Sequence, residues 1–213
     1  MTHDITKEQY ISNPCGVCAT AYWKNSCFNK PDNIRLIHER DMHSVAQNAR
    51  TEKYFRLIHN LRDMDAATLS DEYSFQTVDI KTQKESVAHF INRCYEDMDI
   101  RPEHIDKWTK YSVFDNTLWV FIYENASVSP VALGIADFDK NVREGSLEWI
   151  QVLPQKRGHG LGKAVVSELL LRLKDKASFV TVSGQTDNKT NPESLYRECG
   201  FTGNDYWYVV SAV

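Results

Sequence analysis

The sequence predicts a mixed α/β (α+β) fold, in which helices flank a central sheet of about six or seven strands and an N-terminal extension precedes it. Three observations support this prediction. Short runs rich in β-branched and aromatic residues, such as 118–123, alternate with helical patterns along residues 74–213. Apolar residues recur at the i, i+3, i+4, i+7 spacing within 84–95. A glycine-rich turn at 155–162 joins a strand-like run to a helical one.

The expected elements of the core follow one another from residue 74 onward. In chain order we expect a strand at 74–80, helices at 84–95 and 102–111, strands at 118–123, 131–138 and 146–153, a helix at 163–174, a strand at 179–183, a last helix and a last strand at 206–210. The last helix has Asn191 as a natural N-cap, Pro192 at its first helical position and Gly200 as a natural stop. Residues 74–213 are therefore predicted to form the main domain.

Residues 1–73 are predicted to be an N-terminal extension that packs on this core. They contain possible strands at 34–38 and 54–58, but no glycine-rich loop and no repeat of the later half. We therefore expect no second catalytic unit in the extension.

Cysteines in the extension raise the question of a metal. Cys15 and Cys18 form a Cys-x-x-Cys pair, which is the local half of many zinc sites, and Cys27 with His38 or His43 could complete one. A redox pair is another reading. A second Cys-x-x-Cys is missing, so the pattern favours small buried apolar groups and no metal.

Composition restricts the classes of function. The 213 residues include 42% apolar and 25% charged residues, as in an ordinary globular protein, and the net charge is −4 with pI near 6.0. A general nucleic-acid binder is normally strongly basic, so none is expected. The chain has no signal-peptide core and no run near the ~20 apolar residues of a membrane helix. With an odd number of cysteines, these features predict a cytoplasmic protein. We expect a monomer or a homodimer.

The glycine-rich turn has the features of an anion site. Gly158, Gly160 and Gly162 leave backbone N–H groups uncovered at the positive end of the following helix, and Lys156, Arg157 and Lys163 add positive charge. A Walker loop is excluded because Ala164 stands where a Ser or Thr is needed. A dinucleotide fingerprint is a poor match, because the glycines are one residue too close and the motif lies late in the chain.

A second motif makes the pattern specific. The segment Leu195-Tyr196-Arg197-Glu198-Cys199-Gly200-Phe201 follows the Gln-x-x-Gly-x-Gly turn, and with both motifs the chain resembles the GNAT superfamily of N-acetyltransferases over roughly residues 74–213. The resemblance implies a GNAT fold and acetyl-CoA as cosubstrate, with its pyrophosphate on the glycine loop. The residues expected to bind acetyl-CoA are Ile150, Val152, Gln155, Lys156, Arg157, Gly158, His159, Gly160, Leu161, Gly162, Lys163, Asn188 and Asn191. Asn188 and Asn191 approximate the asparagine that the family places before its tyrosine helix, although their spacing differs from the usual one.

Acetyl transfer to an amine also requires proton transfers. An alkyl amine with a pKa near ~10.4 is protonated at neutral pH, so a base is useful, and Glu148 is the first candidate because strand alternation places it on the face of Ile150 and Val152. Asp137 and Asp139 are the alternatives. The resemblance implies that Tyr196 protonates the leaving thiolate and that a backbone N–H near Val152 receives the oxyanion.

Three functions remain open at this stage. The first is transfer of an acetyl group from acetyl-CoA to a primary amine of an unidentified acceptor by direct attack, without metal or acyl-enzyme. The second is a catalytically silent acyl-CoA-binding module. The third is an interaction protein whose working part is the extension. The acceptor pocket is expected to be built by loops, with a contribution from the extension possible.

Overall fold

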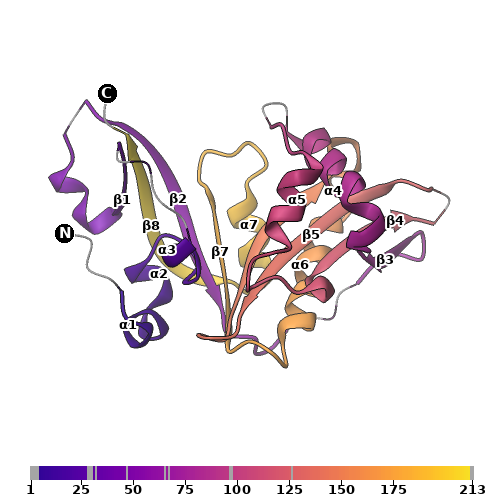
Figure 1. Cartoon of the computed structure of the whole chain (residues 1–213), viewed down its shortest axis with the longest axis horizontal. Helices are drawn as coiled ribbons and strands as arrows, with labels where there is room; N and C mark the ends of the chain where they lie inside the picture. The colour runs from indigo at the N-terminus through magenta and orange to yellow at the C-terminus, as the bar shows by residue number, and fades with distance from the viewer. Residues whose placement is uncertain are drawn as a thin grey trace.

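The computed structural model describes residues 5–27, 31, 33–46, 48–64, 66, 68–95, 98–125 and 127–211. In these residues one eight-stranded sheet has the order β1-β8-β2-β7-β6-β5-β4-β3 (Figure 1). The pair β6 and β7 is parallel, and the other neighbours are antiparallel. The strands are β1 (Ile34–His38), β2 (Arg50–His59), β3 (Tyr73–Thr77), β4 (Trp119–Glu124), β5 (Pro130–Asp139), β6 (Glu144–Val152), β7 (Phe179–Gln185) and β8 (Thr202–Ser211).

Helices cover both faces of the half of the sheet that contains β4, β5 and β6. Phe90 on α4 packs on Phe121 of β4, so α4 covers one face, and a Cβ on Gly134 of β5 would lie 2.3 Å from Val165 of α6, so α6 covers the other. The described helices are α1 (Lys7–Ser12), α2 (Pro14–Val17), α3 (Lys24–Cys27), α4 (Ile80–Cys94), α5 (Pro102–Trp108), α6 (Leu161–Leu173) and α7 (Pro192–Glu198), with 3₁₀ turns η1 (Glu39–Ser44), η2 (Asn116–Leu118) and η3 (Pro154–Lys156).

The predicted fold class is confirmed, with more strands than expected. The extension supplies the additional ones, because β1 and β2 both pair with β8 and β2 also pairs with β7. The first 73 residues thus contribute to the main sheet, and the proposed domain boundary at residue 73 stays a prediction.

Two local expectations are corrected. Ile80 begins α4 and does not end a strand, because the Asp79 carboxylate caps the helix by accepting from Lys81 N (3.1 Å). Asn191 does precede α7, but its φ is +46° and its side chain makes no capping hydrogen bond within the described residues.

The parallel strands β6 and β7 pair over only part of their length. Residues 144–147 of β6 pair with 179–182 of β7, and β6 then continues to Val152 without that partner. In Figure 1 the ribbon of β7 diverges from β5, with α7 between them. This side of β6 therefore leaves room for a ligand that enters as an added strand, although Val152 O there accepts from Arg157 Nε (3.3 Å).

The extension is fixed to this region by a buried polar network. The carboxylate of Glu144, at the start of β6, accepts from Tyr10 Oη (2.6 Å), Thr181 Oγ1 (2.5 Å) and the backbone N–H of Tyr22 (2.9 Å). Arg56 of β2 lies 3.4 Å from the same carboxylate, and the Arg56 and Glu144 side chains are 3% and 1% exposed. The chain before α3 is thereby held beside β6.

Candidate active site

The glycine-rich turn forms a cradle at the N-terminus of α6. Gly158 and Gly160 have φ angles of +80° and +74°, which favour glycine, and a Cβ at either position would have no heavy atom within 4 Å. The first α-helical turn closes with Ala164 N donating to Gly160 O (3.0 Å). The N–H groups of this turn precede the intrahelical ladder and are directed out of the positive helix end.

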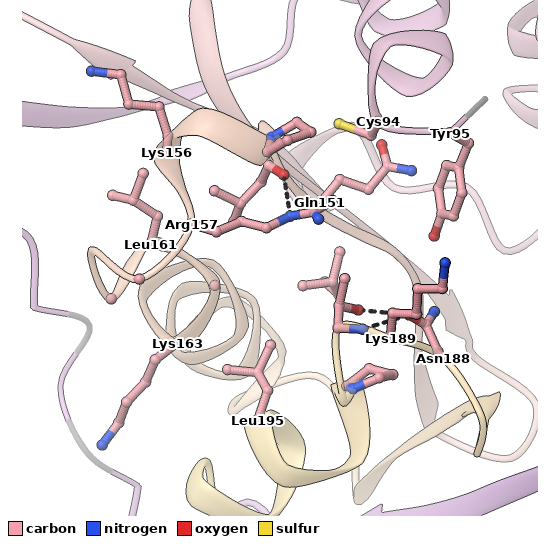
Figure 2. Close-up of a pocket in the computed structure, with 18 of the residues that line it drawn as sticks. Cys94, Tyr95, Gln151, Lys156, Arg157, Leu161, Lys163, Asn188, Lys189 and Leu195 are labelled. Atoms are coloured by element: carbon pink, nitrogen blue, oxygen red, sulfur yellow. Dashed lines mark hydrogen bonds between the residues drawn. The ribbon is translucent and has the colours of Figure 1, made fainter.

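A pocket of about 890 Å³ lies between this cradle, the free part of β6, α7 and the end of α4. We call it the larger pocket. Figure 2 shows Tyr95 at the end of α4 and Lys189 before α7 facing one another across it. Its lining residues are Asn92, Arg93, Cys94, Tyr95, Ile150, Gln151, Val152, Pro154, Lys156, Arg157, Gly158, Gly160, Leu161, Gly162, Lys163, Asn188, Lys189, Thr190, Pro192, Leu195, Tyr196 and Glu198.

Most residues expected to bind the cosubstrate come together in this pocket. From that set, Ile150, Val152, Lys156, Arg157, Gly158, Gly160, Leu161, Gly162, Lys163 and Asn188 line it. Gln155, His159 and Asn191 lie in the same loops but are not among its lining residues. His159 is exposed, and its Nδ1 lies 3.0 Å from Arg157 O.

Two cations of the cradle already have partners. Lys156 Nζ lies 2.7 Å from Glu124 Oε2, and this carboxylate raises the pKa of Lys156. Arg157 Nε donates to Val152 O (3.3 Å), at the free edge of β6. Their charge remains near the cradle, and both side chains keep further N–H donors for a phosphate.

Tyr196 on α7 lies at the inner wall of the larger pocket. Its side chain is 7% exposed and packs between Phe55 and Phe201. Burial raises the pKa of Tyr196, and Tyr95, Cys199 and Glu148 raise it further. The phenol is therefore protonated at neutral pH and able to donate a hydrogen bond.

Glu148 occupies a β-bulge, which changes where it points. Opposite β5, Ile135 faces Trp149 and Ala136 faces Leu147, so Glu148 is the extra residue of β6. The expectation that Glu148 shares a strand face with Ile150 and Val152 does not hold, because the bulge interrupts the alternation of side chains. Glu148 instead lines a second pocket with Trp149.

This second pocket, called the smaller pocket below, has a volume of about 160 Å³ and holds two carboxyl groups. Burial, followed by the Glu148 carboxylate, raises the pKa of Asp137 well above its usual range, whereas Lys24 lowers it. Ser146 Oγ donates to Glu148 Oε1 (2.9 Å). The lining residues are Trp23, Lys24, Trp108, Tyr111, Trp119, Ile135, Asp137, Glu148 and Trp149.

The two pockets adjoin along β6. Tyr95 of the larger pocket and Trp149 of the smaller one are in ring contact, with centroids 6.3 Å apart. Asp139, the third candidate base, lines neither pocket and accepts from Asn141 N (2.8 Å). The structure thus brings Glu148 and Asp137 together and leaves Asp139 apart.

Gln151 is a pocket residue that the sequence reasoning missed. It is 5% exposed, lines the larger pocket, and within the described residues both polar atoms of its amide lack a hydrogen-bond partner. A buried unpaired amide is costly, so a ligand amide would be a favourable partner. The available signal was a glutamine between the apolar residues Ile150 and Val152, just before the glycine-rich turn.

Cys15 and Cys18 are buried free thiols, and burial raises the pKa of Cys15 to about 11. The side chain of Cys27 lies outside the described residues. Among the residues described, no group of three His, Cys, Asp or Glu side chains is arranged to hold a metal. Within the same part of the chain, no helix has the length and apolar character that crossing a membrane requires.

Comparison with known proteins gives a family match and several structural likenesses. Residues 115–203 match the family described as acetyltransferase (GNAT) domain, whereas no curated protein matches the chain. A GCN5-related N-acetyltransferase from Sphaerobacter thermophilus has a TM-score of 0.71 at 15% identity, covering 84% of this chain and 58% of its own. A GNAT-family acetyltransferase from Colwellia psychrerythraea gives 0.59 at 13%, covering 84% and 64%.

The ribosomal-protein-S18-alanine N-acetyltransferase of Escherichia coli is also similar, with a TM-score of 0.52 at 16% identity over 65% of this chain and 92% of its own. At such identities these likenesses concern the fold alone. The chain spans less than two thirds of the Sphaerobacter and Colwellia proteins.

Proposed function

We propose that this chain, which contains a GNAT acetyltransferase domain, transfers an acetyl group from acetyl-CoA to a primary amine by direct attack. The family match supports acyl transfer in general. The observation that carries the finer proposal is the junction of two pockets on β6, one with an anion cradle and one with paired carboxyl groups.

The larger pocket fits the cosubstrate. The N–H groups at the start of α6 suit a pyrophosphate, and the turn glycines let its oxygens approach the backbone. The free edge of β6 can pair with the amides of an extended pantetheine arm, and the unpaired Gln151 amide offers a further partner. Gln155, His159 and Asn191 remain part of the proposed binding region as loop residues that support the cradle.

The smaller pocket fits the amine. An ammonium group must lose a proton before its nitrogen can attack, and Glu148 is the proposed acceptor of that proton, directly or through water. Asp137 is the second carboxyl group. Its raised pKa keeps it protonated over a wider pH range, so the pair can hold a proton without two adjacent negative charges.

The remaining steps use the backbone and Tyr196. The amine lone pair attacks the thioester carbonyl carbon, and the carbonyl electrons move to oxygen, where a backbone N–H near Val152 stabilises the oxyanion. Collapse restores the carbonyl and expels the CoA thiolate, to which the Tyr196 hydroxyl gives its proton. Glu148 releases the first proton to solvent and then takes the proton that the new amide nitrogen must lose, and the Tyr196 phenolate regains its proton from solvent. No metal is required in this sequence.

The proposal extends to the surroundings of the enzyme. Cys15, Cys18 and Cys94 are free thiols, which suits a reducing compartment such as the cytoplasm. We propose acetyl-CoA and an amine acceptor as the partners of a monomer or homodimer, with no nucleic acid and no membrane involved.

The test combines binding with turnover. Calorimetry should show acetyl-CoA binding to the wild-type chain, and a screen of polyamines, aminoglycosides, amino acids and peptide N-termini should identify an acceptor. Glu148→Gln should then lower the turnover rate by about 10²–10⁴-fold with nearly unchanged acetyl-CoA affinity. Binding without transfer to any amine would support the silent module, and absence of acetyl-CoA binding would refute the assignment.

A further inference from the structure

A cation of the protein itself already sits in the smaller pocket. Lys24, at the start of α3, forms an ion pair with Glu148, and these side chains are 25% and 20% exposed. The Lys24 ammonium also lies 5.5 Å from the centroid of the Trp23 ring. A primary ammonium group on an aliphatic chain therefore contacts the carboxylate that we propose as the base.

The walls of the smaller pocket are aromatic. Trp108 stacks on Trp149 with centroids 5.5 Å apart and an interplanar angle of 23°. Trp108 also contacts Trp119 (6.4 Å), and Trp23 contacts Tyr111 (5.1 Å). Aromatic faces attract cations and also pack against methylene groups, so these walls suit an alkyl chain with a charged end.

A second observation concerns the charge of the smaller pocket, which is lined by Asp137 and Glu148. The Glu148 carboxylate opposes the ionisation of Asp137 and Lys24 favours it, so positive charge is favourable in this pocket. The smaller pocket therefore favours a bound cation, and in this structure the Lys24 side chain provides it.

We propose that the smaller pocket binds an alkyl primary ammonium as the acceptor, and that the Lys24 side chain occupies this position as an internal mimic. This inference rests on the proposed acetyltransferase function. The acceptor must displace Lys24 from Glu148, and its methylene groups then take the place of the lysine stem among the tryptophan rings. Acceptors whose amine is attached to a linear aliphatic chain should be favoured over amines on branched or cyclic carbon.

The experiment removes the Lys24 side chain and adds n-butylammonium in its place. n-Butylammonium has the four carbons and the ammonium group of a lysine side chain. The dissociation constant of n-butylammonium should be at least about 10-fold lower for Lys24→Ala than for wild type, because the competing Lys24 ammonium has been removed. The fluorescence of the pocket tryptophans measures this binding. n-Butanol, which lacks the charge, should not bind, and Lys24→Met should bind more weakly than Lys24→Ala because its side chain still fills the space.

Each outcome bears on the proposal. Equal affinity of wild type and Lys24→Ala for n-butylammonium, or equal binding of n-butanol, would overturn it. Adding Glu148→Gln to Lys24→Ala should abolish the gain, and a retained gain would also overturn it. Circular dichroism checks folding, and Lys24→Ser provides the same test if the alanine variant does not fold.

A separate measurement distinguishes this inference from the proposed function. With acetyl-CoA present, Lys24→Ala should acetylate n-butylamine with a higher kcat/KM than wild type. Binding of n-butylammonium without any acetyl transfer would refute the proposed function but leave the ammonium site supported. Acetyl transfer to another amine, with no n-butylammonium binding, would refute the ammonium site and keep the function.

Discussion

Replacing Gly158 by aspartate should weaken acetyl-CoA binding far more than replacing it by asparagine. Gly158 lines the larger pocket, its φ is +80°, and a Cβ there would meet no heavy atom within 4 Å. Neither side chain therefore clashes with the protein. Asparagine and aspartate share the same shape and tolerate the left-handed region similarly, so the backbone cost cancels between the two variants.

The remaining difference is one negative charge beside the expected position of the pyrophosphate. At a separation of about 5 Å, Coulomb's law gives about 3 kcal/mol at an effective dielectric constant of about 20 and about 1 kcal/mol in bulk water. The dissociation constants of the Asp and Asn variants should therefore differ by about 5-fold to 150-fold. Raising the ionic strength from about 0.05 M to about 0.5 M should reduce this ratio.

Calorimetry on the two variants measures this ratio directly. Gly203→Asp is the matched control, because Gly203 also has a positive φ (+116°) but lies on β8 and lines neither pocket. Its affinity for acetyl-CoA should equal that of wild type. Equal dissociation constants for Gly158→Asp and Gly158→Asn would refute the cradle as the anion site.

Three further predictions concern catalysis and stability. Tyr196→Phe should lower the single-turnover rate by about 10–10²-fold with little change in acetyl-CoA affinity. This loss is small for a general acid, because the raised pKa makes the Tyr196 phenol a weak acid. Equal rates would mean that Tyr196 only packs against its neighbours. Glu144→Gln should lower the free energy of unfolding by about 3 kcal/mol, because it leaves Arg56 buried without its counter-ion. Glu52→Gln, at a side chain that is 38% exposed, should cost less than about 1 kcal/mol, and similar losses in urea unfolding would contradict this. The pKa of Asp137 is raised on folding, so its contribution to stability is present below its unfolded pKa and is lost as pH rises through the folded pKa. The difference in unfolding free energy between wild type and Asp137→Asn should therefore fall with pH, by at most about 1.4 kcal/mol per pH unit. A pH-independent difference would exclude this contribution.

The sequence by itself determined the elements whose signals are local. The turn with Gly158 and Gly160 could be identified because left-handed residues before a helix favour glycine. The helix carrying Tyr196 could be identified from Pro192 at its start and Gly200, with φ +89°, after its end. The periodicity of apolar residues similarly predicted the strands and helices of the core, because each period depends only on residues close in sequence.

The tertiary structure alone decided how distant segments complete the site. β2 enters the sheet between β7 and β8, a pairing that no local pattern specifies. Glu148 points into the smaller pocket because pairing with β5 creates a bulge, and a one-residue shift in register changes the face that a side chain occupies. Lys24 meets Glu148 across 124 residues of sequence. The free energy of such contacts depends on the entropy of closing the intervening chain and on burial in the folded protein. Local sequence patterns do not report either quantity. The residues that we expect to bind the acceptor can therefore be identified only from the tertiary structure.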